Sequence, residues 1–426
     1  MKSLFPILVC SVVVAACSTA PDEATSERVV FQVTADTEEA FVYETLVSAF
    51  EREHPDIDVE LVAIANKDDH LARLATSFAG GEPPDVFLVN FREFSQFVVR
   101  EAIEPSGPLL EESGLDPADY YEQPIEAFTY DGSLQCWPQN ISSLVVYFNT
   151  GLFEQADVDL PEPGWSFDDF RATALALKEA RDAGVLGQDV DALGIDPGII
   201  RIAPFVWSNG GEVVDDLERP TRFTLDGQEA REALGSVVSL VREDEVMPSE
   251  EEIASQDLET RFAAGKLGMF LSSRRDTPVF REQLQLRWDV AGLPVTDEPA
   301  SILHSDAYCF SRGAGSLDDA VAFAGYALGD EGQTITALGG RTVPSLRSVA
   351  TSGAFLDPVQ PPESSQVFLD AIPLLRRTPV IPTWPEIEDL SDEILLRAFY
   401  EEGYTLDDAL EDLERITRPL FEEGAP

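Results

Sequence analysis

The segment LQCWPQNISSLVVYFN, residues 134–149, contains two short extended runs separated by a polar break. Pro138 marks the break, because proline cannot donate a ladder hydrogen bond and it drives the preceding Trp137 toward extended geometry. The second run, Leu144 to Phe148, is apolar, mostly β-branched or aromatic, and bounded by polar residues, which is typical of a buried strand. We predict that the chain leaves one α/β lobe here and enters a second.

Length and charge set the first limits on this protein. A chain of 426 residues exceeds the size at which one core usually keeps growing, so two domains are expected. The 79 acidic and 29 basic residues give a formal charge of −50, which disfavours nucleic acids and anionic membranes as partners. An acidic, lysine-poor surface suits a saline medium, where the screening length falls to about 3 Å at 1 M salt. We therefore expect a salt-adapted (halophilic) source.

The amino terminus predicts export. Residues 1–16 have a lysine near the start, an apolar centre and small residues at the end, which is the pattern of a signal peptide. Val14-Ala15-Ala16-Cys17 resembles the lipobox of bacterial lipoproteins. That resemblance implies a lipid on Cys17, anchoring the protein outside the cytoplasm on the periplasmic or cell-surface side. Residues 17–27 would be the tether; the alternative is an ordinary secreted protein with a chance cysteine.

Two cysteines remain for structural roles in the exported chain. Cys10 leaves with the signal peptide and Cys17 is modified, which leaves Cys136 and Cys309. An oxidising compartment favours a disulfide between them, and two buried free thiols are the alternative.

From Val29 onward the pattern alternates strand and helix. Expected strands cover 29–33, 57–64 and 85–89, and expected helices cover 38–53, with Thr37 as its cap, and 70–78. Such alternation predicts an α/β lobe with a mostly parallel sheet and ligand loops at the carboxyl ends of its strands.

An ordered set of motifs makes the chain recognisable. It includes FEREHP at 50–55, PDVF at 84–87, VVYFN at 145–149, WSFDDF at 165–170, NGG at 209–211, FAAGKLGM at 262–269 and WPEI at 384–387. This set resembles the extracellular solute-binding proteins of bacterial ABC importers, in the sugar-binding branch that includes maltose-binding protein. The resemblance implies a periplasmic-binding-protein-like type II fold, with two α/β lobes, a multi-strand hinge and a ligand cleft between the lobes. The amino lobe would comprise 28–138 plus 306–352, and the carboxyl lobe 139–305 plus 353–426.

The same resemblance implies how the hinge is built. The second crossing would be His304 to Phe310, lying beside the first crossing as a small ribbon. That arrangement would bring Cys136 near Cys309 and favours the disulfide.

Local patterns in the second half agree with this arrangement. Helices are expected at 167–183, with Ser166 as the cap, and at 202–207, 225–243, 258–264, 316–328, 331–337, 366–375 and 389–416, with strands at 193–195 and 267–272.

A sugar needs flat aromatic surfaces beside fixed polar groups. Three tryptophans at expected loops or element ends are candidate platforms: Trp137, Trp207 and Trp384. The alternative for each is packing in a core or between the lobes.

The candidate polar ligand residues are those in expected loops, where their side chains could face the cleft. They are Asp36 and Glu38 after the first strand, Asn90, Phe91 and Arg92 after the third, Arg274 and Arg275 after the strand ending at Ser272, and Asp306 and Arg341 on return loops. The alternative for the charged members is a surface or interlobe ion pair.

The sequence contains no motif typical of metal binding or catalysis. The three histidines are far apart and have no HExxH or cysteine spacing, so no metal is expected. We expect no cofactor and no catalysis. We expect a monomer that captures a carbohydrate by closing about its hinge. The permease subunits of an ABC importer would then receive the carbohydrate. The open alternatives are a peptide, polyamine or phosphorylated polyol ligand on the same fold, and a secreted glycan-cleaving enzyme.

Overall fold

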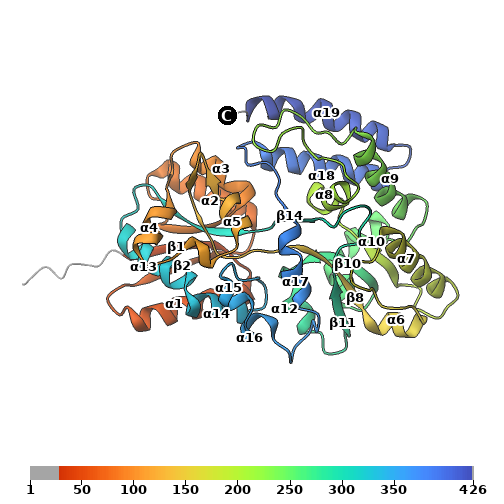
Figure 1. The fold of residues 1–426 in the computed structure, drawn as a ribbon, viewed down its shortest axis with the longest axis horizontal. Helices are drawn as coiled ribbons and strands as arrows, with labels where there is room; N and C mark the ends of the chain where they lie inside the picture. The colour runs from red at the N-terminus through yellow and green to blue at the C-terminus, as the bar shows by residue number, and fades with distance from the viewer. Residues whose placement is uncertain (1–27, 425–426) are drawn as a thin grey trace, which may run out of the picture.

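The computed structural model describes residues 28–424, which form two α/β lobes side by side (Figure 1). The expected signal peptide, the tether and Cys17 lie outside these residues. Within residues 28–424, no helix is both long enough and apolar enough to cross a membrane.

The amino lobe is built on a sheet in the order β2-β1-β3-β13-β4. β1 (Val29–Thr34), β2 (Val59–Ile64) and β3 (Val86–Asn90) are parallel, as the alternating pattern predicts. β13 (Asp306–Ser311) returns from the second half of the chain and pairs antiparallel with β3 and β4 (Ile103–Glu104). The helix α1 (Thr37–Glu53) follows β1, and its cap is Asp36 rather than the expected Thr37, because the Asp36 carboxylate accepts from the amides of Glu38 and Glu39.

Two crossing segments lie side by side at the hinge. β7 (Trp137–Pro138) pairs antiparallel with β13, with Trp137 opposite Tyr308. A disulfide joins Cys136 to Cys309, with 4.5 Å between their Cα atoms. The amide of Ser142 donates to the carbonyl of His304 at 2.8 Å, which continues the ribbon toward the carboxyl lobe.

The carboxyl lobe has a mixed sheet in the order β11-β8-β10-β9. β8 (Leu144–Asn149) is buried along its whole length, as its apolar composition predicts, and it is antiparallel to β10 (Leu267–Ser273) and β11 (Trp288–Ala291). β9 (Asp191–Gly194) is parallel to β10. The helices around this sheet include α7 (Phe167–Asp182), capped by Ser166, α8 (Ile199–Ser208), α9 (Gln228–Arg242) and α11 (Leu258–Ala263).

The last part of the chain contributes helices to both lobes. α13 (Leu317–Leu328) and α14 (Asp330–Leu338) pack on the amino lobe, whereas α18 (Trp384–Tyr400) and α19 (Leu406–Glu423) cover the carboxyl lobe (Figure 1). The prediction of one helix over 389–416 is wrong, because the chain turns after Tyr400, with Gly403 at φ +81°, and Thr405 caps a new helix. The expected helix at 366–375 also ends early: α17 (Gln366–Asp370) gives way to a 3-10 turn at Ile372–Leu374 and to β14 (Leu375–Arg376), which pairs with β12 (Ser301–Ile302).

Shorter elements complete the two lobes. They are α2 (Lys67–Gly80), α3 (Phe91–Val98), α4 (Ser106–Glu112), η1 (Pro117–Asp119), α5 (Glu122–Ala127), β5 (Thr129–Tyr130), β6 (Ser133–Leu134), α6 (Thr150–Ala156), α10 (Glu250–Ser255), η2 (Arg274–Asp276), α12 (Thr277–Arg281), α15 (Arg347–Ala350) and α16 (Gly353–Leu356).

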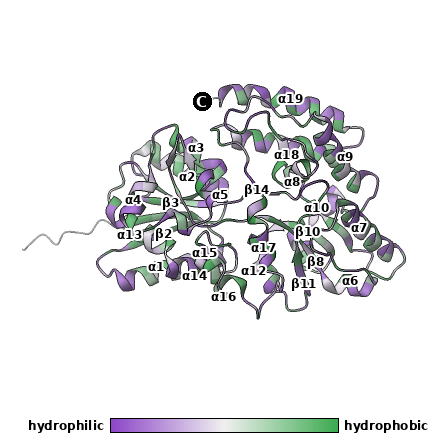
Figure 2. Cartoon of the chain, in the orientation of Figure 1, coloured by the Kyte–Doolittle hydropathy of each residue, from purple (hydrophilic) through white to green (hydrophobic). Residues whose placement is uncertain are grey.

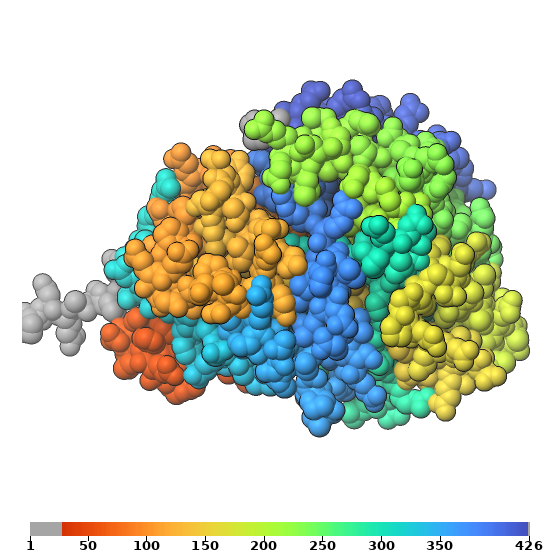
Figure 3. Space-filling model, viewed as in Figure 1, coloured from red at the N-terminus to blue at the C-terminus, as the bar shows by residue number. Residues whose placement is uncertain are grey.

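Hydrophobic residues are concentrated in the strands of both sheets, and hydrophilic residues are frequent along the helices (Figure 2). The buried apolar side chains form two cores. One core fills the amino lobe and continues through the hinge to one face of the second sheet, where it includes Tyr147, Phe270 and Trp288. A second core lies between the other face of that sheet and helices α7, α8, α9, α18 and α19. In the space-filling view, the chain between α16 and β14 covers the seam between the lobes on the side facing the viewer (Figure 3).

Candidate functional site

A cavity of about 260 Å³ lies between the lobes beside the hinge. Its walls come from the ends of β1 and β3, the two hinge crossings, and the residues that follow β10. Five of the predicted ligand residues line it: Asn90, Arg92, Arg275, Asp306 and Arg341. Residues 90–92 do not form the expected loop, because Asn90 caps α3 by accepting from the amide of Arg92.

Asp306 holds the hinge and the end of β3 together. One carboxylate oxygen accepts from Asn90 Nδ2 and the other from Asn140 Nδ2, both at 3.1 Å. The amide of Asp306 donates in turn to Asn140 Oδ1 at 3.0 Å. The floor of the cavity is therefore a fixed polar surface made from three separate segments.

Arg92 links this surface to the opposite lobe. Its Nε donates to Asn90 Oδ1 at 3.1 Å, and its Nη1 forms an ion pair with Glu388 on α18. The side chains of Arg92 and Glu388 are only 11% and 10% exposed. Burial opposes the charge on Arg92, but the Glu388 carboxylate outweighs it and the pKa of Arg92 is raised. Trp384 Nε1 donates to the second Glu388 oxygen at 3.2 Å, which fixes the carboxylate.

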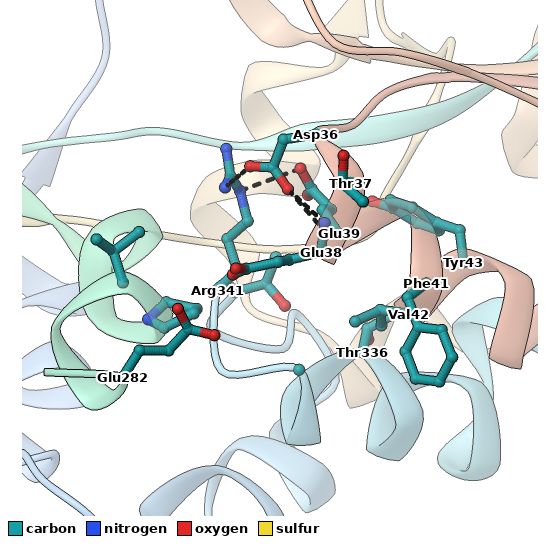
Figure 4. Close-up of a pocket in the computed structure, with 14 residues that line it drawn as sticks. Asp36, Thr37, Glu38, Glu39, Phe41, Val42, Tyr43, Glu282, Thr336 and Arg341 are labelled. Atoms are coloured by element: carbon teal, nitrogen blue, oxygen red, sulfur yellow. Dashed lines mark hydrogen bonds and ion pairs between the residues drawn. The ribbon is translucent and has the colours of Figure 1, made fainter. Parts of the chain in front are cut away.

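A second cavity, of about 420 Å³, adjoins the first at Arg341 (Figure 4). The Arg341 guanidinium contacts Asp36 at 2.8 Å and Glu39 at 3.1 Å, and Glu282 faces them from the carboxyl lobe, just after α12 (Figure 4). Burial raises the pKa of Glu39 to about 7, although Arg341 acts in the opposite direction. Asp36 and Glu38 line this cavity rather than the first one.

Several buried nitrogen atoms near the hinge lack a partner among residues 28–424. They include Trp137 Nε1 in the first hinge crossing, His304 Nε2, and Nε and Nη1 of Arg201 in the first turn of α8. Burial lowers the pKa of His304 well below its usual value, and the charges of Arg92, Arg201 and Arg275 lower it further. Burial also lowers the pKa of Arg201, and the charges of Asp196 and Asp276 act in the opposite direction.

Asp392, one helical turn beyond Glu388, accepts a hydrogen bond from the first residue of α8. Its Oδ1 accepts from the amide of Ile199 at 2.8 Å. Burial raises the pKa of Asp392 to about 7, and the nearby Glu388 carboxylate adds to the shift. Among residues 28–424, no group of three or more histidine, cysteine and acidic side chains could hold a metal ion.

A family model described as bacterial extracellular solute-binding protein matches residues 45–361. The chain belongs to this solute-binding family. A binding protein of Brucella abortus (strain 2308) is 23% identical to it over 377 residues, which cover 85% of each chain.

Solved structures confirm the predicted fold of this solute-binding protein. An ABC substrate-binding protein from Listeria monocytogenes in complex with cycloalternan has a TM-score of 0.82 at 23% identity, covering 92% of this chain and 98% of that one. UgpB from Mycobacterium tuberculosis, in complex with glycerophosphocholine, has a TM-score of 0.81 at 17% identity over 93% and 99% of the two chains. Maltose-bound MalE3 from T. maritima has a TM-score of 0.78 at 17% identity over 92% and 99%.

Four expected ligand residues of the solute-binding protein are core residues, so the expectation that they face the cleft is corrected. Trp137 is fully buried edge-to-face against Tyr120, with ring centroids 5.3 Å apart. Trp384 does not lie in a loop; it opens α18 and packs against Phe223 and Phe421. Phe91 is fully buried at the start of α3, and the buried Arg274 guanidinium lies over the rings of Phe355 and Phe368.

The third predicted platform, Trp207, lines a separate cavity. This cavity, of about 470 Å³, lies between α5 and the chain around β14. There the Arg376 guanidinium stacks on the Trp207 ring, 4.8 Å from its centroid. The structure therefore does not bring the three tryptophans together.

Sequence reasoning missed Arg201, Glu388 and Asp392. The signal for the last two was present, since Glu388 and Asp392 follow Trp384 at intervals of four residues and so share its helix face. That signal becomes visible only when the helix is started at Trp384 instead of Asp389.

Proposed function

We propose that this solute-binding protein captures a carbohydrate in the cleft beside the hinge and delivers it to an ABC importer. One observation carries the proposal: polar side chains from both lobes and from the hinge converge on one cavity, where Asp306 and Arg92 are already held in place by hydrogen bonds. Fixed donors and acceptors of this kind match the hydroxyl groups of a sugar. The similar proteins from Listeria monocytogenes and T. maritima, solved with cycloalternan and maltose, support the ligand class.

The mechanism is closure about the hinge. The ligand contacts both lobes only when they are closed, so its binding free energy shifts the population from open to closed. The closed surface is then what the permease subunits of the importer recognise. No covalent step is required, and the protein is proposed to act as a monomer without catalysis, as a lipoprotein held outside the cytoplasm by a lipid on Cys17.

The test is a binding screen on the purified chain without its signal peptide. Neutral oligosaccharides, charged saccharides, glycerophosphodiesters, peptides and polyamines are compared by ligand-dependent shifts of the thermal unfolding midpoint, followed by calorimetry. We expect a saccharide to bind, to reduce the radius of gyration in small-angle X-ray scattering, and to be recovered intact. Recovery of a shortened saccharide, or binding confined to peptides or polyamines, would refute the proposal.

A matched pair of variants locates the site. Arg275 and Arg287 are both surface arginines of the carboxyl lobe, 57% and 60% exposed, but only Arg275 lines the cavity. Arg275→Ala should weaken binding, and Arg287→Ala should not. Equal affinities for the two variants would show that the ligand does not bind in this cavity.

A further inference from the structure

We propose that the captured carbohydrate is an oligosaccharide whose outer sugar units occupy the second cavity, where the exposed ring of Phe41 is their stacking platform. This inference rests on the proposed function and narrows its ligand class to saccharides long enough to reach from the hinge to Phe41.

The cavity beside the hinge and the second cavity adjoin over a shared wall. Four residues line both of them: Glu39, Tyr43, Arg341 and Thr342. Small-molecule sites usually enclose about 300–1,000 Å³. The hinge cavity, of about 260 Å³, lies below that range, whereas the second cavity contributes about 420 Å³. The second cavity is therefore an adjoining space into which a ligand held beside the hinge can extend.

The hinge cavity itself has no exposed aromatic ring. Among the described residues that line it, Tyr43 is the single one with a phenol, phenyl or indole ring, and it is only 3% exposed. The Tyr43 ring packs edge-to-face against Phe31, with ring centroids 5.7 Å apart. Trp137 and Trp384 are buried in the cores. The hinge cavity therefore supplies polar contacts but no surface on which a sugar ring can stack.

Phe41 provides such a surface in the second cavity. Among the phenylalanine, tyrosine and tryptophan residues of 28–424, it is the single one with an exposed side chain, at 68% exposure. Packing of α1 does not account for this ring, because Tyr43, Leu46 and Phe50 form the buried face on the opposite side of the helix. Phe41 instead lines the second cavity.

The second cavity combines apolar surface with hydrogen-bond acceptors. Beyond Phe41, its apolar wall residues include Pro278 and Val279, which belong to α12 of the carboxyl lobe. Glu38 and Glu282 line the cavity from opposite lobes (Figure 4), and neither forms an ion pair among residues 28–424. Apolar C–H faces and hydroxyl donors are the groups that a sugar presents to such a wall.

A ligand in this cavity also depends on closure of the lobes. Phe41 belongs to the amino lobe, and Glu282 follows α12 of the carboxyl lobe. An outer sugar unit therefore contacts both residues only when the lobes are closed. We expect each sugar unit that reaches this cavity to add to the free energy that favours the closed form.

A length series tests the inference on the full mature chain. Gluco-oligosaccharides of one to five units, with either α-1,4 or β-1,4 linkages, are compared by calorimetry under identical conditions. We expect the trisaccharide of at least one linkage to bind about tenfold or more tightly than glucose.

Variants assign the effect to Phe41. Phe41→Ala should lower the affinity for the trisaccharide by about tenfold and change the affinity for glucose much less, whereas Phe41→Trp, which keeps a flat ring, should restore most of the loss. Leu338→Ala is the matched control, because Leu338 is 64% exposed on the same lobe but lines neither cavity. Since both side chains are exposed, the thermal midpoints of the unliganded variants should equal that of wild type.

The outcomes separate the inference from the proposed function. If the trisaccharide binds no more tightly than glucose, or if Phe41→Ala binds it like Leu338→Ala, the inference is overturned and the proposed function stands. If no saccharide of either linkage binds, both are overturned.

Discussion

Arg92 of the amino lobe and Glu388 of the carboxyl lobe form an ion pair across the cleft. Arg92 lies in the first turn of α3, and Glu388 lies in the first turns of α18, so the pair joins two residues that are 296 positions apart in the chain. It links Arg92, which lines the cavity, to α18 of the carboxyl lobe.

We predict that Glu388→Gln opens the unliganded protein. Removing one charge leaves Arg92 buried beside a neutral group, which can cost several kcal/mol, about 3–5 for a broken buried pair. Opening the hinge returns Arg92 to water and avoids that cost. Small-angle X-ray scattering should therefore show a larger radius of gyration for this variant. The control is Glu401→Gln, which removes an exposed pair with Arg397 on the outer side of the lobe. An unchanged radius for Glu388→Gln would contradict the prediction.

The disulfide should contribute strongly to stability. Cys136 and Cys309 are separated by 173 residues in the sequence, so their bond restricts the unfolded chain over a long loop. Replacing both by alanine should lower the free energy of unfolding by about 2–5 kcal/mol in urea titrations. Reduced wild-type protein should behave like the double variant. Equal urea midpoints for oxidised wild type and the variant would refute this expectation.

The acidic surface should make stability dependent on salt. With a formal charge of −50, the acidic side chains repel one another in the folded state. Salt screens this repulsion, because the Debye length falls from about 10 Å at 0.1 M to about 3 Å at 1 M. We expect the thermal midpoint to rise by more than about 2 °C over this range, which corresponds to roughly 2 kcal/mol for a chain of this length. A neutral osmolyte at equal osmolality is the control. A midpoint that falls or stays constant with salt would argue against a salt-adapted surface.

The sequence predicted the fold well because its signals are local. The period-two and helical patterns over 29–89 specify β1, α1, β2, α2 and β3, and the break at Pro138 marks the first hinge crossing. The antiparallel return of β13 and the mixed second sheet depend on long-range pairing, which no local pattern contains.

The site was harder to predict because exposure is a tertiary property. Trp137 and Trp384 stand beside prolines, which favoured loops, but the packed rings of Tyr120 and Phe421 bury them. The polar group beside Trp384 is Glu388, whose ion pair depends on Arg92 from the other lobe. A pairing between distant segments is needed before such a residue can be recognised.

Asp392 should make stability fall as pH rises. Burial raises its pKa from 3.8 to about 7, so between these values the folded chain holds a proton that the unfolded chain has released. The folded state is therefore favoured at the acidic end of the range, and this advantage is lost as pH rises through about 7. Asp392→Asn keeps an oxygen for the Ile199 amide but cannot ionise. At pH 8 the variant should be more stable than wild type by at most about 4 kcal/mol, and near pH 4 the two should be close.

Urea titrations of both proteins at the two pH values measure this difference directly. Carboxylates distant from Asp392 titrate equally in wild type and variant, so the difference between the two proteins isolates Asp392 together with its coupling to Glu388. The control is Asp407→Asn at an exposed position, where the side chain pairs with Arg231 at the surface. If Asp392→Asn changes stability by the same amount at both pH values, the carboxyl is not protonated in the folded protein, and the start of α8 is held by a charged group instead.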